Sequence, residues 1–190
     1  IYSNPDASEK TLNVSNRKVH KFIGLVVSVQ LLLWTVSGIF FSFNKIDQIR
    51  GENYLKSVEQ ITPEKISRIS FDEAKEIVIE KTYLYPISVE EITEEKRGSE
   101  FRGRNLPLYK LSSVDSSDKE VNVYIDPSLG KIVAIRTFEW RVWDLMWGLH
   151  IMDWRDREDI NNFFLKIFSI LALISSITGI ILFFRPKSKA

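Results

Sequence analysis

The sequence contains no cysteine and only two histidines, His20 and His150. The absence of cysteine excludes disulfides, thiolate metal sites and thiol nucleophiles. Two histidines alone leave little material for a zinc or iron site built from side chains. The sequence also lacks a glycine-rich phosphate loop, a nucleophile elbow and a dinucleotide-binding motif. These absences exclude many catalytic centres and make the two imidazoles the main candidates for chemistry.

An excess of either charge is also missing. The 26 lysines and arginines nearly balance the 25 aspartates and glutamates, which leaves a formal net charge of +1. Nucleic-acid binding normally requires a marked basic excess. The composition therefore predicts no nucleic-acid partner.

Two long uncharged apolar runs dominate the chain, Phe22–Phe43 and Ile167–Phe184, and Phe163 and Phe164 extend the second. At about 1.5 Å per residue, the first run is about 33 Å long, enough to cross the hydrocarbon core of a bilayer. It is too long for a signal-peptide core and lacks a small-residue cleavage site, which favours an uncleaved signal anchor. The sequence predicts an integral membrane protein with two spanning helices in a lipid bilayer.

The charges that flank the two runs predict the orientation. Before the first run and after the second, the flanking charges are almost all basic: Lys10, Arg17, Lys18, Lys21, Arg185, Lys187 and Lys189. The other two ends carry mixed charges. Because cytoplasmic loops are enriched in lysine and arginine, both termini should be cytoplasmic. We expect a two-pass protein of the bacterial inner (cytoplasmic) membrane, with residues 45–160 in the periplasm.

The segment between the runs carries the signals of a small α+β domain. Ser70 and Glu73 form a capping box before an apolar helical stripe that should end near Thr82. Strands are expected at 106–114, 121–125 and 131–137, the last two joined by a turn at 126–130. The predicted fold class is α+β, with two transmembrane helices flanking an extracytoplasmic helix packed on a small antiparallel sheet.

These expectations give one domain plan. It comprises a flexible cytoplasmic tail (1–13), transmembrane helix 1 (14–44), an extracytoplasmic domain (45–138), a tryptophan-rich interfacial helix and turn (139–160), transmembrane helix 2 (161–185) and a cytoplasmic tail (186–190).

Tryptophans recur at helical spacing just before the second run. The stripe consists of Trp140, Trp143, Trp147, His150 and Trp154. Tryptophan prefers the membrane–water interface, so these four indoles, together with Trp34, should anchor the protein there. Stacking on a cofactor is the alternative use of the stripe.

Small residues within the runs predict helix packing in lipid, at Gly24, Gly38 and Gly179. Ordinary membrane-helix composition is the alternative explanation. Gln30 lies in mid-membrane and should face protein. Two spanning helices provide few packing contacts for a protein that is alone in the membrane, so a homodimer or a place in a larger membrane complex is expected.

Several short motifs together resemble the PepSY family with associated transmembrane helices, in a compact two-helix branch. The motifs are residues 17–25 (RKVHKFIGL), 33–38 (LWTVSG), 71–74 (FDEA), 108–110 (LYK), 123–126 (VYID) with Gly130-Lys131, 149–154 (LHIMDW), Asn161-Asn162, and 176–179. Their order and spacing cover about residues 15–186. The central motifs resemble the PepSY domain itself.

The resemblance implies a membrane redox role, because larger relatives include ferric-siderophore reductases that carry electrons through b-type haems held by membrane histidines. This chain has two helices rather than four. It would then be a non-catalytic subunit of an electron-transfer assembly, with His20 and His150 as candidate axial ligands of haem iron. The rival function is a membrane-anchored scaffold whose external PepSY domain docks a partner protein, without cofactor.

The two histidines cannot serve one haem within one chain. Two axial imidazoles lie roughly 4 Å apart, at about 2 Å each from the iron, whereas the two runs place His20 and His150 toward opposite membrane faces. A symmetric dimer could pair each histidine with its copy, or another subunit could supply the second ligand. Otherwise both are ordinary interfacial residues, with His150 bonded to Asp153 or Trp154.

Overall fold

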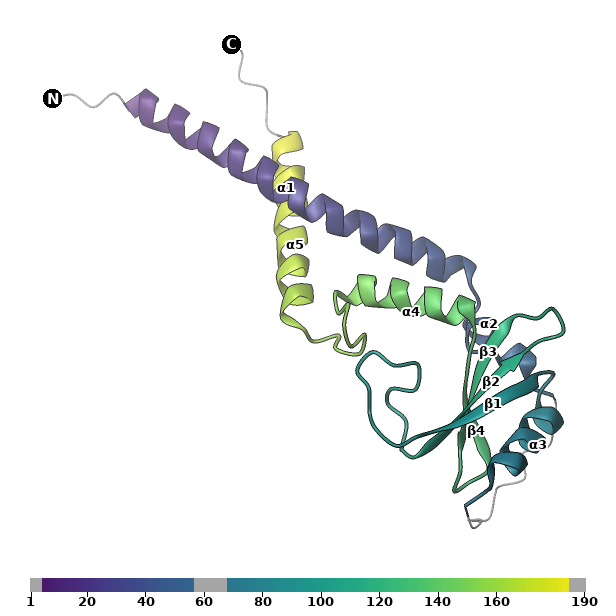
Figure 1. Cartoon of the computed structure of the whole chain (residues 1–190). Coiled ribbons are helices and arrows are strands. Elements are labelled where there is room, and N and C mark those ends of the chain that lie inside the picture. The colour runs from purple at the N-terminus through teal and green to yellow at the C-terminus, as the bar shows by residue number, and fades with distance from the viewer. Residues whose placement is uncertain (1–4, 57–67, 185–190) are drawn as a thin grey trace.

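The computed structural model describes residues 5–56 and 68–184, and Figure 1 shows how they are arranged. The elements in chain order are α1 (Pro5–Phe43), α2 (Ile46–Ile49), the 3-10 helix η1 (Glu52–Tyr54), α3 (Phe71–Lys81), β1 (Tyr85–Ile92), β2 (Leu108–Val114), β3 (Glu120–Asp126), β4 (Lys131–Arg136), α4 (Phe138–Ile151) and α5 (Phe163–Phe184).

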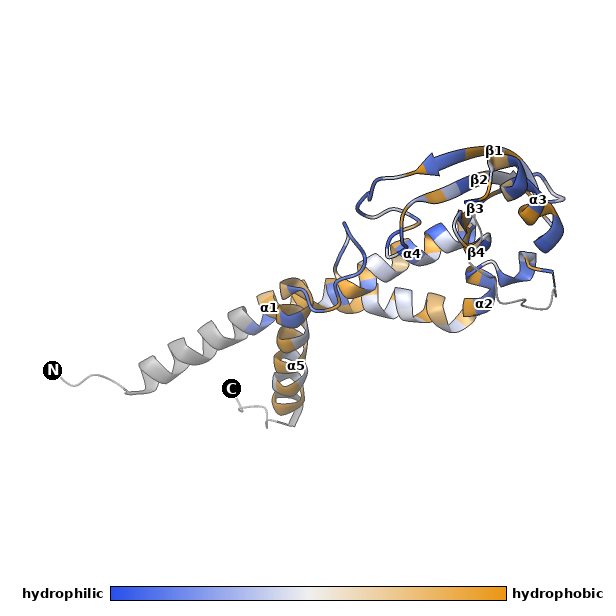
Figure 2. Ribbon diagram, turned by 90° about the horizontal axis from the view of Figure 1, so that it is seen from below, coloured by the Kyte–Doolittle hydropathy of each residue, from blue (hydrophilic) through white to orange (hydrophobic). Residues whose placement is uncertain are grey.

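Two helices are long and apolar enough to cross a membrane, over His20–Phe43 of α1 and Phe163–Ile181 of α5. None of the α5 span is buried inside the structure, and large apolar side chains such as Leu32 and Leu173 are more than 60% exposed. In Figure 2, α5 is coloured hydrophobic along most of its length. Faces of this kind are stable only against lipid or other apolar helices.

The N-terminal segment differs from the expected flexible tail. Residues 5–13 are helical and continuous with the membrane span, so α1 starts nine residues before the expected boundary at residue 14. Proline suits the first position of a helix, and no further proline or glycine interrupts the chain before Gly24. Adding residues to an existing helix avoids the cost of nucleation. Residues 1–4 and the predicted tail 186–190 lie outside the described residues.

The segment between the two candidate spans forms a four-stranded antiparallel sheet in the order β1-β2-β3-β4, with α3 packed on one face. This confirms the α+β expectation. The sequence predicted only the three strands from β2 onward. The β1 strand was missed because it lies at an edge of the sheet, and its sequence carries Pro86, Glu90 and Glu91 in place of a clean apolar alternation.

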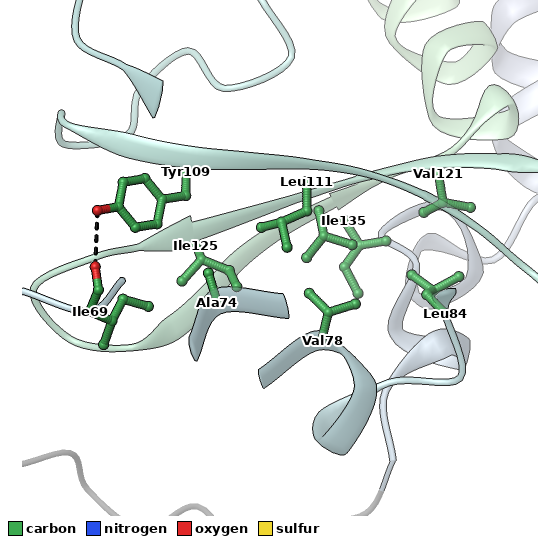
Figure 3. Packing of buried hydrophobic residues seen from close by; sticks show 10 residues of the cluster. Ile69, Ala74, Val78, Leu84, Tyr109, Leu111, Val121, Ile125 and Ile135 are labelled. Carbon is green, nitrogen blue, oxygen red and sulfur yellow. Dashed lines mark hydrogen bonds between the residues drawn. The ribbon is translucent and has the colours of Figure 1, made fainter. Parts of the chain in front are cut away.

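The core lies between α3 and the sheet (Figure 3). As predicted, the Ser70 hydroxyl accepts from the Glu73 amide at 3.3 Å, and the Ser70 amide donates to the Glu73 carboxylate at 2.6 Å. This box orients α3 so that Ala74 and Val78 are fully buried. The Tyr109 hydroxyl donates to the Ile69 carbonyl at 3.0 Å, which closes one end of the core.

Helices α4 and α5 both contact α1, but at different places along it. Figures 1 and 2 show α4 running beside the C-terminal half of α1, while α5 crosses α1 steeply nearer its N-terminus. The long helix is therefore the element that joins the membrane part to the α+β domain.

The absence of native cysteine allows a direct test of orientation. Ser116 is exposed in the turn after β2, whereas Ser113 is only 2% exposed and unsuitable for labelling. With residues 45–160 outside, an impermeant maleimide added to intact cells should label Ser116→Cys and spare Ser188→Cys until the cells are lysed. Labelling of Ser188→Cys alone would reverse the proposed orientation.

Candidate functional site

His20 contacts the second membrane helix through its ring. Its Nδ1 lies 3.0 Å from the Thr178 hydroxyl on α5. That hydroxyl also donates to the Ile174 carbonyl at 2.8 Å, one turn earlier on α5. The sequence predicted no partner for His20, because 158 residues separate the pair.

His150 makes an equivalent contact near the other end of the span. Its Nδ1 lies 2.8 Å from the hydroxyl of Ser37 on α1, and Ser37 is only 1% exposed. The same hydroxyl donates to the Leu33 carbonyl at 2.8 Å. The Trp34 indole N–H donates to the His150 carbonyl at 2.7 Å, so α1 holds both the ring and the backbone of His150.

Both hydroxyls restrict the protonation of the imidazole that they contact. A serine or threonine hydroxyl has one hydrogen, and here the backbone carbonyl one turn earlier accepts it. The oxygen is then free to accept from Nδ1–H, an assignment made from the hydrogen-bond pattern. Among the described residues, neither Nε2 makes a hydrogen bond. In a neutral imidazole with Nδ1 protonated, the lone pair is on Nε2, the atom that would bind a metal.

Burial also affects the protonation of the His150 ring. Desolvation disfavours the imidazolium cation and lowers the pKa of His150 below its ordinary value of 6.5. The uncharged form of the ring is therefore favoured. The expected partners Asp153 and Trp154 are not bonded to it. The Asp153 carboxylate instead accepts from the amides of Asp156, Glu158 and Asp159, which closes the turn after α4.

The structure keeps the two imidazoles apart. His20 lies on α1, and His150 contacts Ser37, which is 17 positions further along the same helix. At about 1.5 Å per residue, this corresponds to roughly 25 Å. One metal ion cannot bind both rings in one chain. Among the described residues, no group of three or more histidine, aspartate or glutamate side chains is placed to hold a metal ion.

The tryptophan stripe divides into parts with different surroundings. Trp143 and Trp147 stack at 5.7 Å with an interplanar angle of 9°, and both pack on Phe41 of α1. The Trp147 ring also stacks on His150 at 6.4 Å. Both indoles therefore join α4 to α1, and Trp147 covers one face of the imidazole.

The remaining tryptophans differ from the expected single anchoring stripe. Trp140 is only 8% exposed and its ring lies 4.3 Å from the Arg136 guanidinium, so it packs within the α+β domain rather than against lipid. Trp154 is 59% exposed and stacks on Phe164 at the start of α5. Helical spacing places residues on one face, but it does not say which neighbour covers each part of that face.

The three glycines expected at helix contacts have open space around them in the part of the chain that the structure describes. A Cβ built at Gly24, Gly38 or Gly179 would have no neighbouring atom within 4 Å among the described residues. Buried residues of α1 include Val27 and Gln30, and the Gln30 Nε2 lacks a hydrogen-bond partner among the described residues. Packing through these glycines stays a prediction for contacts between chains.

Sequence reasoning missed a buried carboxylate, Asp144. This residue of α4 is 1% exposed and binds the guanidinium groups of Arg102 and Arg157, the latter at 2.6 Å. The three residues join α4, the loop before β2 and the turn before α5. The sequence does contain an indication of this buried carboxylate, because Asp144 and His150 are the only ionisable residues in the apolar stretch 142–152.

Comparison with known families agrees with the motifs. The family model described as PepSY-associated TM region matches residues 17–190. The chain therefore belongs to this family, and it is a membrane-associated PepSY protein. No curated protein and no solved structure gives a match.

Proposed function

We propose that, as a member of this family, the chain is a non-catalytic subunit of a membrane electron-transfer assembly that binds b-type haem through His20 and His150. The observation that carries the proposal is the pairing of each Nδ1 with a hydroxyl already donating to a carbonyl. Ligating histidines usually donate their other ring N–H to such a partner, which orients the ring and fixes the tautomer. Bound haem supplies a one-electron carrier.

The separation of the histidines requires a second chain. Each chain supplies one imidazole, that of His20, near the start of the α1 span and one, that of His150, near its end. A haem site with two axial imidazoles needs two at the same place. A homodimer would pair His20 with its copy and His150 with its copy, and a different subunit could supply the second ligand instead. The uncovered apolar faces of α1 and α5 are suited to contacts of this kind.

The residues around each imidazole would have distinct tasks. Thr178 and Ser37 hold the rings through Nδ1, and Trp34 holds the backbone of His150. Phe41 and Trp147 exclude water from one side of His150. The flanking basic charges support a location in the bacterial inner membrane, with both termini cytoplasmic and the PepSY domain periplasmic.

An optical spectrum of the full chain, purified from native membranes together with any bound subunits, tests this function. Dithionite reduction should produce the α band of a b-type haem. A colourless chain whose native complex shows the band would assign the second ligands to a partner. Absence of the band from both preparations would refute haem binding.

A scaffold without cofactor is the second candidate function, and the exposed edge strand β1 supports it. Tyr85 and Ile87 are 63% and 67% exposed on this edge. An extended segment of a partner protein could add to the sheet there by backbone hydrogen bonds. Pro86 and the irregularity that follows it confine such pairing to about residues 88–92. This function would stand if the haem band were absent.

A further inference from the structure

A cavity of about 490 Å³ lies between the edge strand β4, the segment around η1, and the start of α4. Five consecutive residues of β4, 132–136, form one wall. The remaining lining residues are Arg50, Glu52, Leu55, Arg104 and Trp140. The cavity is separate from both histidines.

The cavity concentrates positive charge. Three arginines and one glutamate line it, a formal excess of two positive charges. Within the described part of the chain, none of the three arginines forms an ion pair with a carboxylate. Elsewhere in the domain, Arg102, Arg141 and Arg157 are all paired in this way.

Arg136 is held in place without being neutralised. Its guanidinium lies 4.3 Å from the Trp140 ring and donates to the carbonyls of Glu100 and Ile135 at 2.9 and 3.1 Å. Burial and the nearby charges of Arg104 and Arg102 lower its pKa to about 10, so it remains a cation at neutral pH. The indole and the two carbonyls orient this cation before any ligand arrives.

We propose that this cavity binds a phosphate group. Several unpaired guanidinium groups converging on one cavity match the geometry and charge of phosphate, which accepts paired hydrogen bonds from arginine. Arg136 supplies the preorganised group, and the exposed Arg50 and Arg104 contribute the other two cations that line the cavity. Glu52 opposes binding by its charge.

The phosphate group could belong to a membrane lipid or to a soluble ligand. Arg50 follows the end of α1 by seven residues, and Trp140 is the third residue of α4, so the site is close to the membrane part of the chain. A phospholipid headgroup and a free phosphate in the aqueous phase offer the same chemistry. The proposal does not depend on haem binding.

Inorganic phosphate tests the aqueous source. The full chain in a neutral detergent should have a higher melting temperature in sodium phosphate than in sodium chloride of equal ionic strength, because a ligand of the folded state stabilises it. The double variant Arg50→Gln/Arg104→Gln should bind phosphate roughly tenfold more weakly or worse, since charge-assisted hydrogen bonds are lost. Glu52→Gln should bind it more tightly.

Nanodiscs test the lipid source. Hydrogen exchange at residues 132–136 should be slower in discs containing phosphatidylglycerol than in discs of phosphatidylcholine alone. The double variant should abolish the difference. Arg97→Gln/Arg155→Gln is the matched control, because it removes the same charge from two exposed arginines outside the cavity.

The results distinguish the sources. An effect of inorganic phosphate alone assigns a soluble ligand, and an effect of phosphatidylglycerol alone assigns a lipid headgroup. The proposal is overturned if neither probe has an effect, or if the double variant and the control respond alike. If the double variant does not fold, the phosphate affinity of the Glu52→Gln variant is the deciding measurement. An affinity equal to that of the wild type would also overturn the proposal.

Discussion

Replacing Asp144 by alanine should destabilise the protein by about 3–5 kcal/mol, because breaking a buried ion pair leaves uncompensated charge. The carboxylate is 1% exposed, and the side chains of Arg102 and Arg157 are only 15% and 28% exposed. Arg157 would lose its carboxylate partner, and Arg102 would keep only one carboxylate contact, with Glu158 at 3.5 Å, in positions where water reaches both guanidinium groups poorly. Unfolding in urea, followed by tryptophan fluorescence of the full chain in detergent, measures the change.

The matched control is Glu139→Ala, on the same helix. Glu139 is exposed, and no hydrogen bond or ion pair of its side chain is found in the described part of the chain. Its replacement should change stability by less than about 0.5 kcal/mol, as is usual for surface positions. Asp144→Asn keeps the shape but removes the charge, and it should fall between the two. Equal stabilities for Asp144→Ala and Glu139→Ala would show that the three residues do not hold α4 in place.

Replacing either histidine by alanine should remove one haem and leave the other spectrally intact. The reason is the separation of roughly 25 Å between the two levels of α1, which prevents one iron from using both rings. In a homodimer with both sites full, two haems are shared by two chains, so haem per chain should approach one before mutation and about half that value after either change. Pyridine haemochrome quantification and redox-difference spectra measure these losses.

The supporting hydroxyls should have smaller effects than the histidines. Ser37→Ala and Thr178→Val remove the Nδ1 partners, and loss of such a partner typically costs about 10–100-fold in affinity. Ser42→Ala and Ser169→Ala are matched controls, since among the described residues their hydroxyls bond to nothing but a carbonyl one turn earlier on α1 and α5. Haem contents equal to wild type in Ser37→Ala and Thr178→Val would contradict the role of these hydroxyls. Full haem retention in both histidine variants would contradict the ligand assignment.

Features with local physical causes could be predicted from the sequence. The capping box, the apolar stripe of α3 and the strands β2–β4 depend on residues close together in the chain, and the structure confirms them. The membrane spans follow from the length of two uncharged runs. The motifs were sufficient to identify the family. Strand β1 was missed because an edge strand tolerates charges and proline that hide its periodicity.

The amino-acid order thus indicated which segments are candidate membrane spans, which form the α+β domain and which two side chains are candidate ligands. The partners of those side chains depend on folding, since Thr178 and Ser37 reach their histidines across 158 and 113 residues. The same holds for the Asp144 cluster, the burial of Trp140 and the arginine-lined cavity. Local sequence patterns determine the face of a helix or strand on which a residue lies. The neighbour that covers this face depends on how the helices and the sheet pack together, and no short stretch of sequence contains that information.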